Sequence, residues 1–265
     1  MKETDYVGLS HFQEFCKDLD EHYVVVGGFA TLMLLDNEIA NHGKATYDID
    51  LVLLSSNSKE ITQRIKQYVK EGEYKIQIGS TDQYQYYRFI EPKKENFAKE
   101  IELFASNENM LELDENQRII PIDPEEGLYS LSAIMLDKEY FEMIKNNIDK
   151  KHIAPCTNTQ ATILLKMSAF YDLKQRGDAK YKKHRRDILK LALLLTGNEE
   201  IILVGRMKED FDTFLAHLEQ DIDSKMLKSI VDKLPVEKEQ IIEILQRVFK
   251  SWDFRINKRF SDSFI

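Results

Sequence analysis

Two aspartates stand two positions apart in an apolar segment, Asp48 and Asp50 within Thr46–Leu54. In a β-strand successive side chains point to opposite faces, so both carboxylates share one face while Ile49 and Leu51 share the other. Adjacent carboxylates repel each other and raise each other's pKa unless a cation compensates them. A divalent metal with oxygen ligands, most simply Mg²⁺ bound together with a phosphorylated substrate, explains the pair. The pattern favours phosphoryl-transfer chemistry; the alternative is a solvated edge strand.

A glycine pair precedes this strand. The apolar run Tyr23–Val26 ends at Gly27 and Gly28, where a helical pattern begins. Glycine allows the backbone to approach a phosphate closely, and the first amides of a helix are ready donors to an anion. The alternative is a tight turn that ends the strand. Thr46 adds a hydroxyl that can orient a metal or a phosphate, although a β-branched residue early in a strand also has a structural reason.

A second acidic segment lies further along, at residues 98–105. Here Glu100 and Glu102 share one face of a predicted strand, opposite Ile101 and Leu103. If this strand lies beside the Asp48–Asp50 strand, one glutamate completes a site of three carboxylates. The alternative is a half-exposed strand with its polar side outward.

Composition sets the broad class. The chain has 265 residues, of which 43% are hydrophobic and 31% are charged, as in an ordinary globular protein. No apolar run approaches the ~20 residues of a membrane helix, and the N-terminus shows no secretory signal. Cys16 and Cys156 lie far apart without metal-ligand spacing. We therefore expect a cytoplasmic protein without a membrane partner.

The charge is unevenly distributed. The net charge is −9, which argues against nonspecific wrapping of nucleic acid. Nevertheless, eight Lys or Arg residues and only two aspartates lie between Lys174 and Lys190. Such a patch can hold a phosphate chain, or it is simply a solvated helix face. Within it, Asp187 is expected to pair with a base of its own helix. Lys166, in an apolar helix at 158–174, either reaches water or points into a cleft.

Strand and helix patterns divide the chain into two parts. Strands are predicted at 23–26, 44–54, 74–78, 84–90 and 98–105, and helices at 10–21, 29–35 and 58–70. From residue 125 the pattern is mainly helical, including helices at 125–135, 138–148 and 199–219. We predict an α+β fold in which a mixed sheet with flanking helices (1–124) precedes a C-terminal helical bundle (125–265).

The glycine pair, the Asp-x-Asp strand and the distal acidic strand together resemble the nucleotidyltransferase fold superfamily. Within it, Val26–Ala30 and Lys44–Leu51 look most like the AbiEii-type enzymes of abortive infection, which are largely toxins of toxin–antitoxin pairs. Lys166–Ala169, Arg176 and Arg185–Leu191 resemble the basic elements of that family's helical half. The resemblance implies a nucleotidyltransferase-like catalytic domain and a helical domain that completes the cleft for nucleotide and acceptor.

The resemblance also implies an activity: pyrophosphate-releasing transfer of a nucleoside monophosphate from ATP, GTP or CTP to an acceptor, with tRNA favoured and an antitoxin protein as partner. The cofactor that it implies is Mg²⁺, as two ions, or Mn²⁺. The metal ligands and catalytic residues would be Asp48, Asp50 and Glu102, with Glu100 in reserve. The nucleotide would be bound by Gly27, Gly28, Thr46, Lys166, Arg176 and Arg186. The alternatives are an antibiotic-modifying nucleotidyltransferase and a catalytically silent binding protein on the same fold.

Overall fold

The computed structural model describes residues 6–36, 46–54, 59–78, 84–106, 119–121, 132–231 and 235–251. The chain divides into two compact units, Met1–Thr162 and Ile163–Ile265. The fold is α+β, with a mixed sheet in the first unit and a mainly helical second unit, as predicted. The boundary predicted between residues 124 and 125 falls outside the described residues.

The first unit contains most of the strands. Its helices are α1 (Val7–Cys16), α2 (Gly27–Asp36), α3 (Lys59–Glu71) and α4 (Lys138–Lys145). Its strands are β1 (Tyr23–Val26), β2 (Asp48–Leu53), β3 (Lys75–Ile78), β4 (Tyr84–Ile90), β5 (Glu100–Ala105), β6 (Ile119–Pro121), β7 (Ser132–Met135), β8 (Ile148–Asp149) and β9 (Cys156–Thr157). The strands pair in the order β3-β4-β5-β2-β1-β9-β8, and β7 joins β5 to β6. The predicted strands at the centre of this sheet are therefore confirmed.

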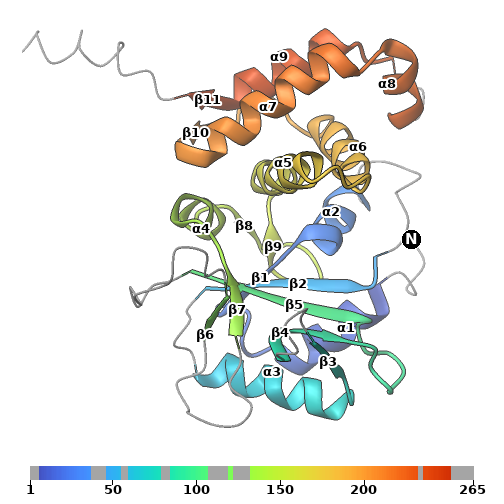
Figure 1. Ribbon diagram of the computed structural model, residues 1–265. Coiled ribbons are helices and arrows are strands. Elements are labelled where there is room, and N and C mark those ends of the chain that lie inside the picture. Colours follow the sequence, from blue (N-terminus) through green and yellow to red (C-terminus); the bar gives the residue numbers. More distant parts are fainter. Residues whose placement is uncertain are drawn as a thin grey trace, which may run out of the picture. The chain divides into compact units, whose positions relative to one another are not determined.

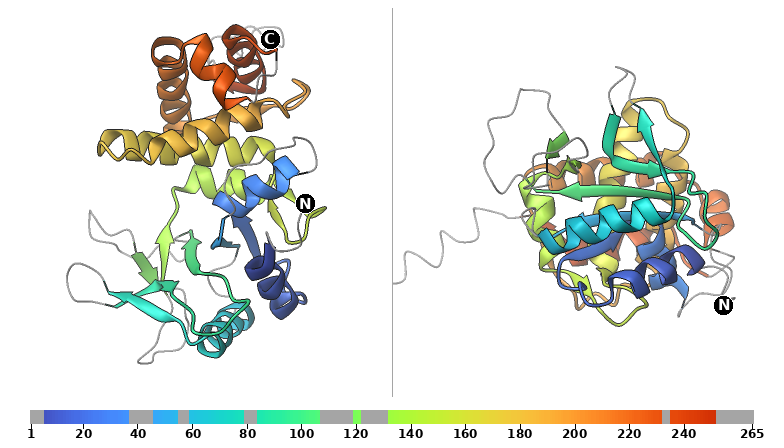
Figure 2. Two further views of the ribbon diagram at one scale, coloured as in Figure 1. Left: turned by 90° about the vertical axis from the view of Figure 1, so that its right-hand side faces the viewer. Right: turned by 90° about the horizontal axis from the view of Figure 1, so that it is seen from below.

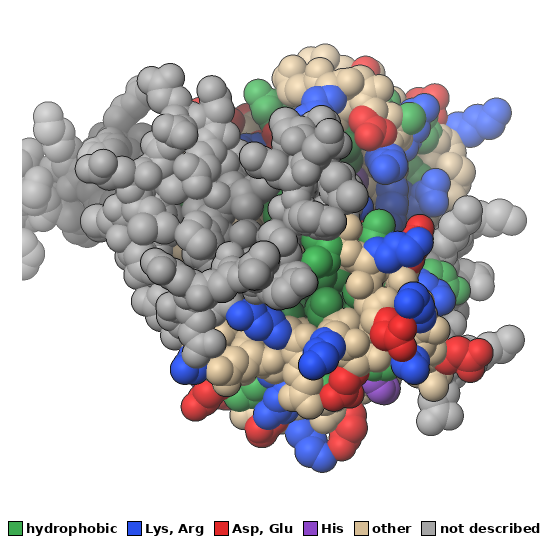
Figure 3. Space-filling model, turned by 60° about the horizontal axis from the view of Figure 1, so that its bottom comes forward, with side chains coloured by type: hydrophobic (Ala, Val, Ile, Leu, Met, Phe, Trp, Pro, Cys, Tyr) green, Lys and Arg blue, Asp and Glu red, His purple; other side chains and the backbone are tan. Residues whose placement is uncertain are grey.

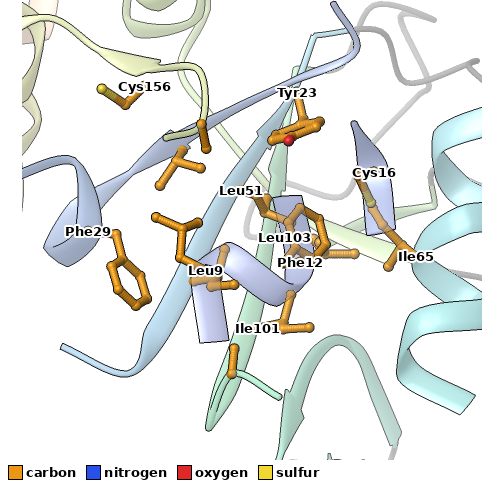
Figure 4. Close-up of a cluster of buried hydrophobic side chains, with 14 of the residues drawn as sticks. Leu9, Phe12, Cys16, Tyr23, Phe29, Leu51, Ile65, Ile101, Leu103 and Cys156 are labelled. Atoms are coloured by element: carbon orange, nitrogen blue, oxygen red, sulfur yellow. The ribbon is translucent and has the colours of Figure 1, made fainter. Parts of the chain in front are cut away.

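Helices α1 and α3 cover one face of the sheet, whereas α2 and α4 lie on the other side (Figures 1 and 2). The first face is apolar because β2 and β5 present every second residue to it. These side chains pack against α1 and α3 in one buried cluster, which Figure 4 shows; its members include Leu9, Phe12, Cys16, Ile49, Leu51, Ile65, Ile101 and Leu103. Because the apolar residues of β2 and β5 face α1 and α3, the alternate residues of these strands lie on the opposite face of the sheet.

In the view of Figure 3, basic and acidic side chains are interspersed over the described surface around an apolar area. Several charges of the first unit pair with each other: Arg64 with Asp18, Lys75 with Glu91, and Lys93 with Glu73. A surface of mixed charge is not the electrostatic signature of a nucleic-acid interface.

The second unit consists of helices joined by short connections. It contains most of α5 (Thr159–Gln175), then α6 (Tyr181–Ala192), α7 (Gly205–Asp221), α8 (Ser224–Ile230) and α9 (Lys238–Val248), with a small parallel pair of β10 (Ile201–Leu203) and β11 (Phe249–Ser251). Phe170 of α5 meets Phe214 of α7 edge to face, with ring centroids 5.3 Å apart. Aromatic pairs of this geometry contribute beyond the area they bury.

Two predicted helices are partly wrong. Residues 132–135, predicted as the end of a helix, form strand β7, which pairs in parallel with the end of β5. Residues 201–203, predicted as part of a helix at 199–219, form β10 beside β11. Both segments are short and apolar, so their local pattern does not separate helix from strand, and pairing with a distant strand decides the outcome.

Candidate functional site

The four predicted carboxylates lie side by side on β2 and β5. These strands pair in parallel with Asp48 opposite Glu100 and Asp50 opposite Glu102. Residues directly opposite on neighbouring strands point to the same face, and neighbouring strands lie about 4.8 Å apart. The intervening residues of both strands belong to the apolar cluster. We call Asp48, Asp50, Glu100 and Glu102 the carboxylate face. A third metal ligand from β5 requires that β5 lies beside β2, and the two strands are indeed neighbours.

The glycine pair meets the carboxylate face at the start of α2. Val26 is paired with Asp50 across β1 and β2, and the chain turns into α2 directly afterwards. Gly27 has φ +66°, and a Cβ added there would overlap the carboxylate of Asp50. A Cβ added at Gly28 would come within 2.6 Å of the Thr46 hydroxyl. Both glycines therefore bring bare backbone against side chains of the candidate site.

Gly27→Ala is expected to lower the free energy of unfolding by about 2 kcal/mol, since a left-handed conformation costs a non-glycine residue about 1–2 kcal/mol and the carboxylate of Asp50 must also move. Urea denaturation measures this loss. Gly28→Ala is the matched control, because Gly28 has no positive φ and the three atoms nearest to its new Cβ belong to the side chain of Thr46. Equal losses in the two variants would contradict the special role given to Gly27.

One residue of this region was not predicted from the sequence: Arg88 of β4. The strand pairs with β5 so that Arg88 lies opposite Glu102. Its Nη2 atom lies 2.6 Å from Glu100 Oε1, whereas Nη1 lies 3.8 Å from Glu102 Oε1. Its Nε atom is buried and has no hydrogen-bond partner among the described residues. The guanidinium of Arg88 thus borders the carboxylate face and contacts both of its glutamates.

The pKa of the Glu102 carboxyl is raised above its ordinary value, chiefly because burial penalises the charged form. The nearby Arg88 lowers the pKa, and the charges of Glu100 and Asp48 raise it further. A carboxylate made more basic in this way accepts a proton more readily. A cation bound at the carboxylate face would oppose this rise and stabilise the charged form of Glu102.

The carboxylates of this face can be compared with the ligands that Mg²⁺ requires. In the described part of the chain, no group of three or more His, Cys, Asp and Glu side chains is arranged to hold a metal ion. Mg²⁺, however, usually takes only one or two protein carboxylates and fills its octahedron with water and substrate phosphates. The Asp48–Asp50 pair on one strand face supplies such carboxylates. The residues present therefore fit a metal that arrives with a phosphorylated substrate, rather than a closed protein cage.

A small cavity of about 160 Å³ borders the site at Thr46. It opens between the start of α1 and the segment before β5, and its walls include Phe29, Tyr47, Phe97 and Lys99. Pockets for drug-sized ligands span about 300–1,000 Å³. This cavity therefore has room for one ring or side chain rather than for a whole nucleotide.

Lys166 lies in the second unit and is bound by a carboxylate. Its side chain is 4% exposed, and its Nζ donates to Asp187 Oδ2 over 2.7 Å. Asp187 therefore pairs across to α5, so the predicted pairing with a base of its own helix is wrong. A buried charge without its partner is costly, so each member of this pair stabilises the other's burial.

The predicted nucleotide-binding residues are distributed over both units. Gly27, Gly28 and Thr46 border the carboxylate face in the first unit. Arg176 and Arg186 belong to the second unit, where both side chains are exposed. Exposure leaves these two guanidinium groups accessible to a phosphate.

His184 on α6 gives the second unit a pH dependence. Burial lowers the pKa of this imidazole to about 4 from 6.5, and the Lys166 ammonium lowers it further, against the opposing effect of Asp187. Between pH 6.5 and about 4, the His184 imidazole is protonated in the unfolded chain but stays neutral in the folded chain. The free energy of unfolding therefore falls as the pH drops from about 6.5 to about 4, where the loss is complete.

The free energy of unfolding should fall by about 3 kcal/mol at most through His184, because one pKa unit corresponds to about 1.4 kcal/mol. Urea denaturation between pH 7.5 and 4.5, with wild type and His184→Gln in parallel, measures it. The variant should show a flatter pH dependence over this window. Superimposable profiles would show that His184 does not titrate as its burial requires.

Comparisons with protein-family models, with curated proteins and with solved structures found nothing that matches this chain. Among the described residues, no helix is long and apolar enough to span a membrane. The geometry of the carboxylate face, with its bordering glycines and Arg88, therefore carries the functional inference below.

Proposed function

We propose that this chain is a cytoplasmic, divalent-metal-dependent nucleotidyltransferase that moves a nucleoside monophosphate from a nucleoside triphosphate to an acceptor hydroxyl. The observation that carries this proposal is the parallel register of β2 and β5, which sets Asp48 and Asp50 beside Glu102 on one sheet face. The helix that starts at Gly27, against Asp50, adds backbone amides at the same place. Carboxylates for a metal and amides for a phosphate are the two donor types that metal–triphosphate binding requires.

The residues have distinct roles in this chemistry. Asp48 and Asp50, together with Glu102, would hold Mg²⁺ or Mn²⁺, as a pair of ions; when bound, the metal supplies charge neutralisation at the phosphates. The amides at the start of α2 orient the triphosphate. Glu102, opposite Asp50 on the neighbouring strand, takes the proton of the acceptor hydroxyl. The acceptor oxygen forms a bond to the α-phosphorus, the bond from that phosphorus to the bridging oxygen breaks, and pyrophosphate leaves.

The acceptor that we favour is tRNA, with the protein acting as the toxin of a toxin–antitoxin pair. The supporting observation is the basic segment that contains Arg176 and Arg186, whose exposed side chains can contact an RNA backbone. A second candidate acceptor is a cationic small molecule such as an antibiotic, which the net charge of −9 favours.

The experiment is a transfer assay with the full chain. Purified protein is incubated with Mg²⁺, with each α-labelled nucleoside triphosphate in turn, and with total RNA, a panel of aminoglycosides, or the protein alone. Label in the tRNA band, lost on chelation, is the expected result. Label in an aminoglycoside instead of tRNA would show that the acceptor is a small molecule, while the proposed transfer reaction would stand. No transfer to any acceptor would favour the catalytically silent binding protein.

A further inference from the structure

Arg88 contacts the two glutamates of the carboxylate face unequally. Since β4 and β5 are antiparallel neighbours with Arg88 opposite Glu102, its side chain emerges on the same face as both glutamates. Yet its short contact, 2.6 Å, is with Glu100, and the contact with Glu102 is 3.8 Å. A guanidinium–carboxylate contact of the shorter length is a charge-assisted hydrogen bond, whereas the longer one is only an electrostatic attraction.

This inequality separates two glutamates that are alike in exposure and in strand pairing. Both lie on β5 opposite an aspartate of β2, and their side chains are 22% and 20% exposed. Exposure and strand pairing alone therefore do not decide whether Glu100 or Glu102 is the third ligand. The short contact with Arg88 does, because a charge-assisted hydrogen bond holds the Glu100 carboxylate toward the guanidinium and competes with a metal for its negative charge.

We propose that Arg88 is a positioning residue that withdraws Glu100 from metal coordination and so leaves Glu102 as the third carboxylate of the site. This inference rests on the proposed function, since it presumes that the carboxylate face holds a divalent metal. Glu100 then has a role of its own: it anchors Arg88 and keeps that cation away from Glu102.

A distinctive consequence follows for variants. In Glu100→Gln the anchor loses its charge, so Arg88 is drawn to Glu102 and competes with the metal there. Metal binding should weaken although Glu100 is not a ligand. Removing Arg88 as well, in Arg88→Gln/Glu100→Gln, also removes the competitor, so metal binding should recover. A structural role for either residue, or a ligand role for Glu100, predicts no such recovery.

The test is a Mn²⁺ titration of the full chain, with free Mn²⁺ followed by electron paramagnetic resonance. We expect Glu100→Gln to weaken Mn²⁺ binding about 10-fold, which is about 1.4 kcal/mol. The double variant should bind within about 3-fold of wild type, and Glu102→Gln should weaken binding at least about 10-fold whether or not Arg88 is present. Far-ultraviolet circular dichroism and melting curves confirm that each variant is folded.

Two results would overturn the inference. A double variant that binds Mn²⁺ as weakly as Glu100→Gln would make Glu100 itself a ligand. Normal binding by Glu102→Gln would remove Glu102 from the site. A different result would contradict the proposed function itself: if the carboxylate face holds no metal, Asp48→Asn/Asp50→Asn binds Mn²⁺ as well as wild type does.

Discussion

Asp48→Asn/Asp50→Asn is expected to reduce nucleotidyl transfer by at least about 10³-fold. The two aspartates are the carboxylates of β2 that point away from the apolar cluster, toward the start of α2. Asparagine keeps their size but removes both negative charges that would hold the metal. Charge stabilisation by a bound metal contributes several kcal/mol in a transition state, and about 4 kcal/mol corresponds to about 10³-fold in rate.

Glu91→Gln provides the matched control for this variant. Glu91 is an exposed acidic residue that directly follows β4, and it pairs with Lys75 rather than with a residue of the carboxylate face. The control should transfer at the wild-type rate, and urea denaturation followed by circular dichroism should show that the double aspartate variant is folded under the assay conditions. Retained, metal-dependent transfer in the double aspartate variant would remove the carboxylate face from the chemistry.

Lys166→Met is expected to lower the free energy of unfolding by about 3–5 kcal/mol, the range for breaking one side of a buried ion pair. The side chain of its partner Asp187 is only 15% exposed, so the carboxylate would be left largely desolvated with its strongest donor gone. This loss would be a large fraction of the stability of a typical domain. Urea denaturation followed by circular dichroism measures it.

Lys166→Met/Asp187→Leu separates the ion pair from a nucleotide role. Replacing both charges with apolar side chains should recover most of the lost stability, because replacing a buried pair by well-packed apolar residues is often neutral. If Lys166→Met were as stable as wild type but bound the triphosphate at least about 10-fold more weakly, Lys166 would be a phosphate ligand first. That outcome would contradict the structural role that the Asp187 contact indicates.

The fold was predictable where local pattern and tertiary contacts agree. The alternation in β2 and β5 reports correctly which residues face the apolar cluster, and the start of α2 at the glycine pair follows from the end of β1. Strand β7 was not predictable in the same way, because Ser132–Met135 is too short to show a period. Its conformation depends on pairing with the end of β5, which is remote in sequence.

The site was predictable only as a list of residue types. Sequence alone placed Asp48 and Asp50 on one face, but the register that sets Asp50 opposite Glu102 is a property of strand pairing. Arg88 went unnoticed for the same reason: a single arginine in a strand has no meaning until its neighbour is known. The Lys166–Asp187 pair joins two helices, and periodicity within either helix does not say which helix faces which.

The most direct test of the proposed metal–triphosphate site is binding of a non-hydrolysable nucleoside triphosphate by isothermal titration calorimetry, with Mg²⁺ and then with a chelator. Each titration is repeated with Asp48→Asn/Asp50→Asn. The carboxylate face predicts binding in wild type that depends on Mg²⁺ and is weakened at least about 10-fold in the variant. Equal affinity with and without Mg²⁺, or in both proteins, would contradict a metal–triphosphate site on this face.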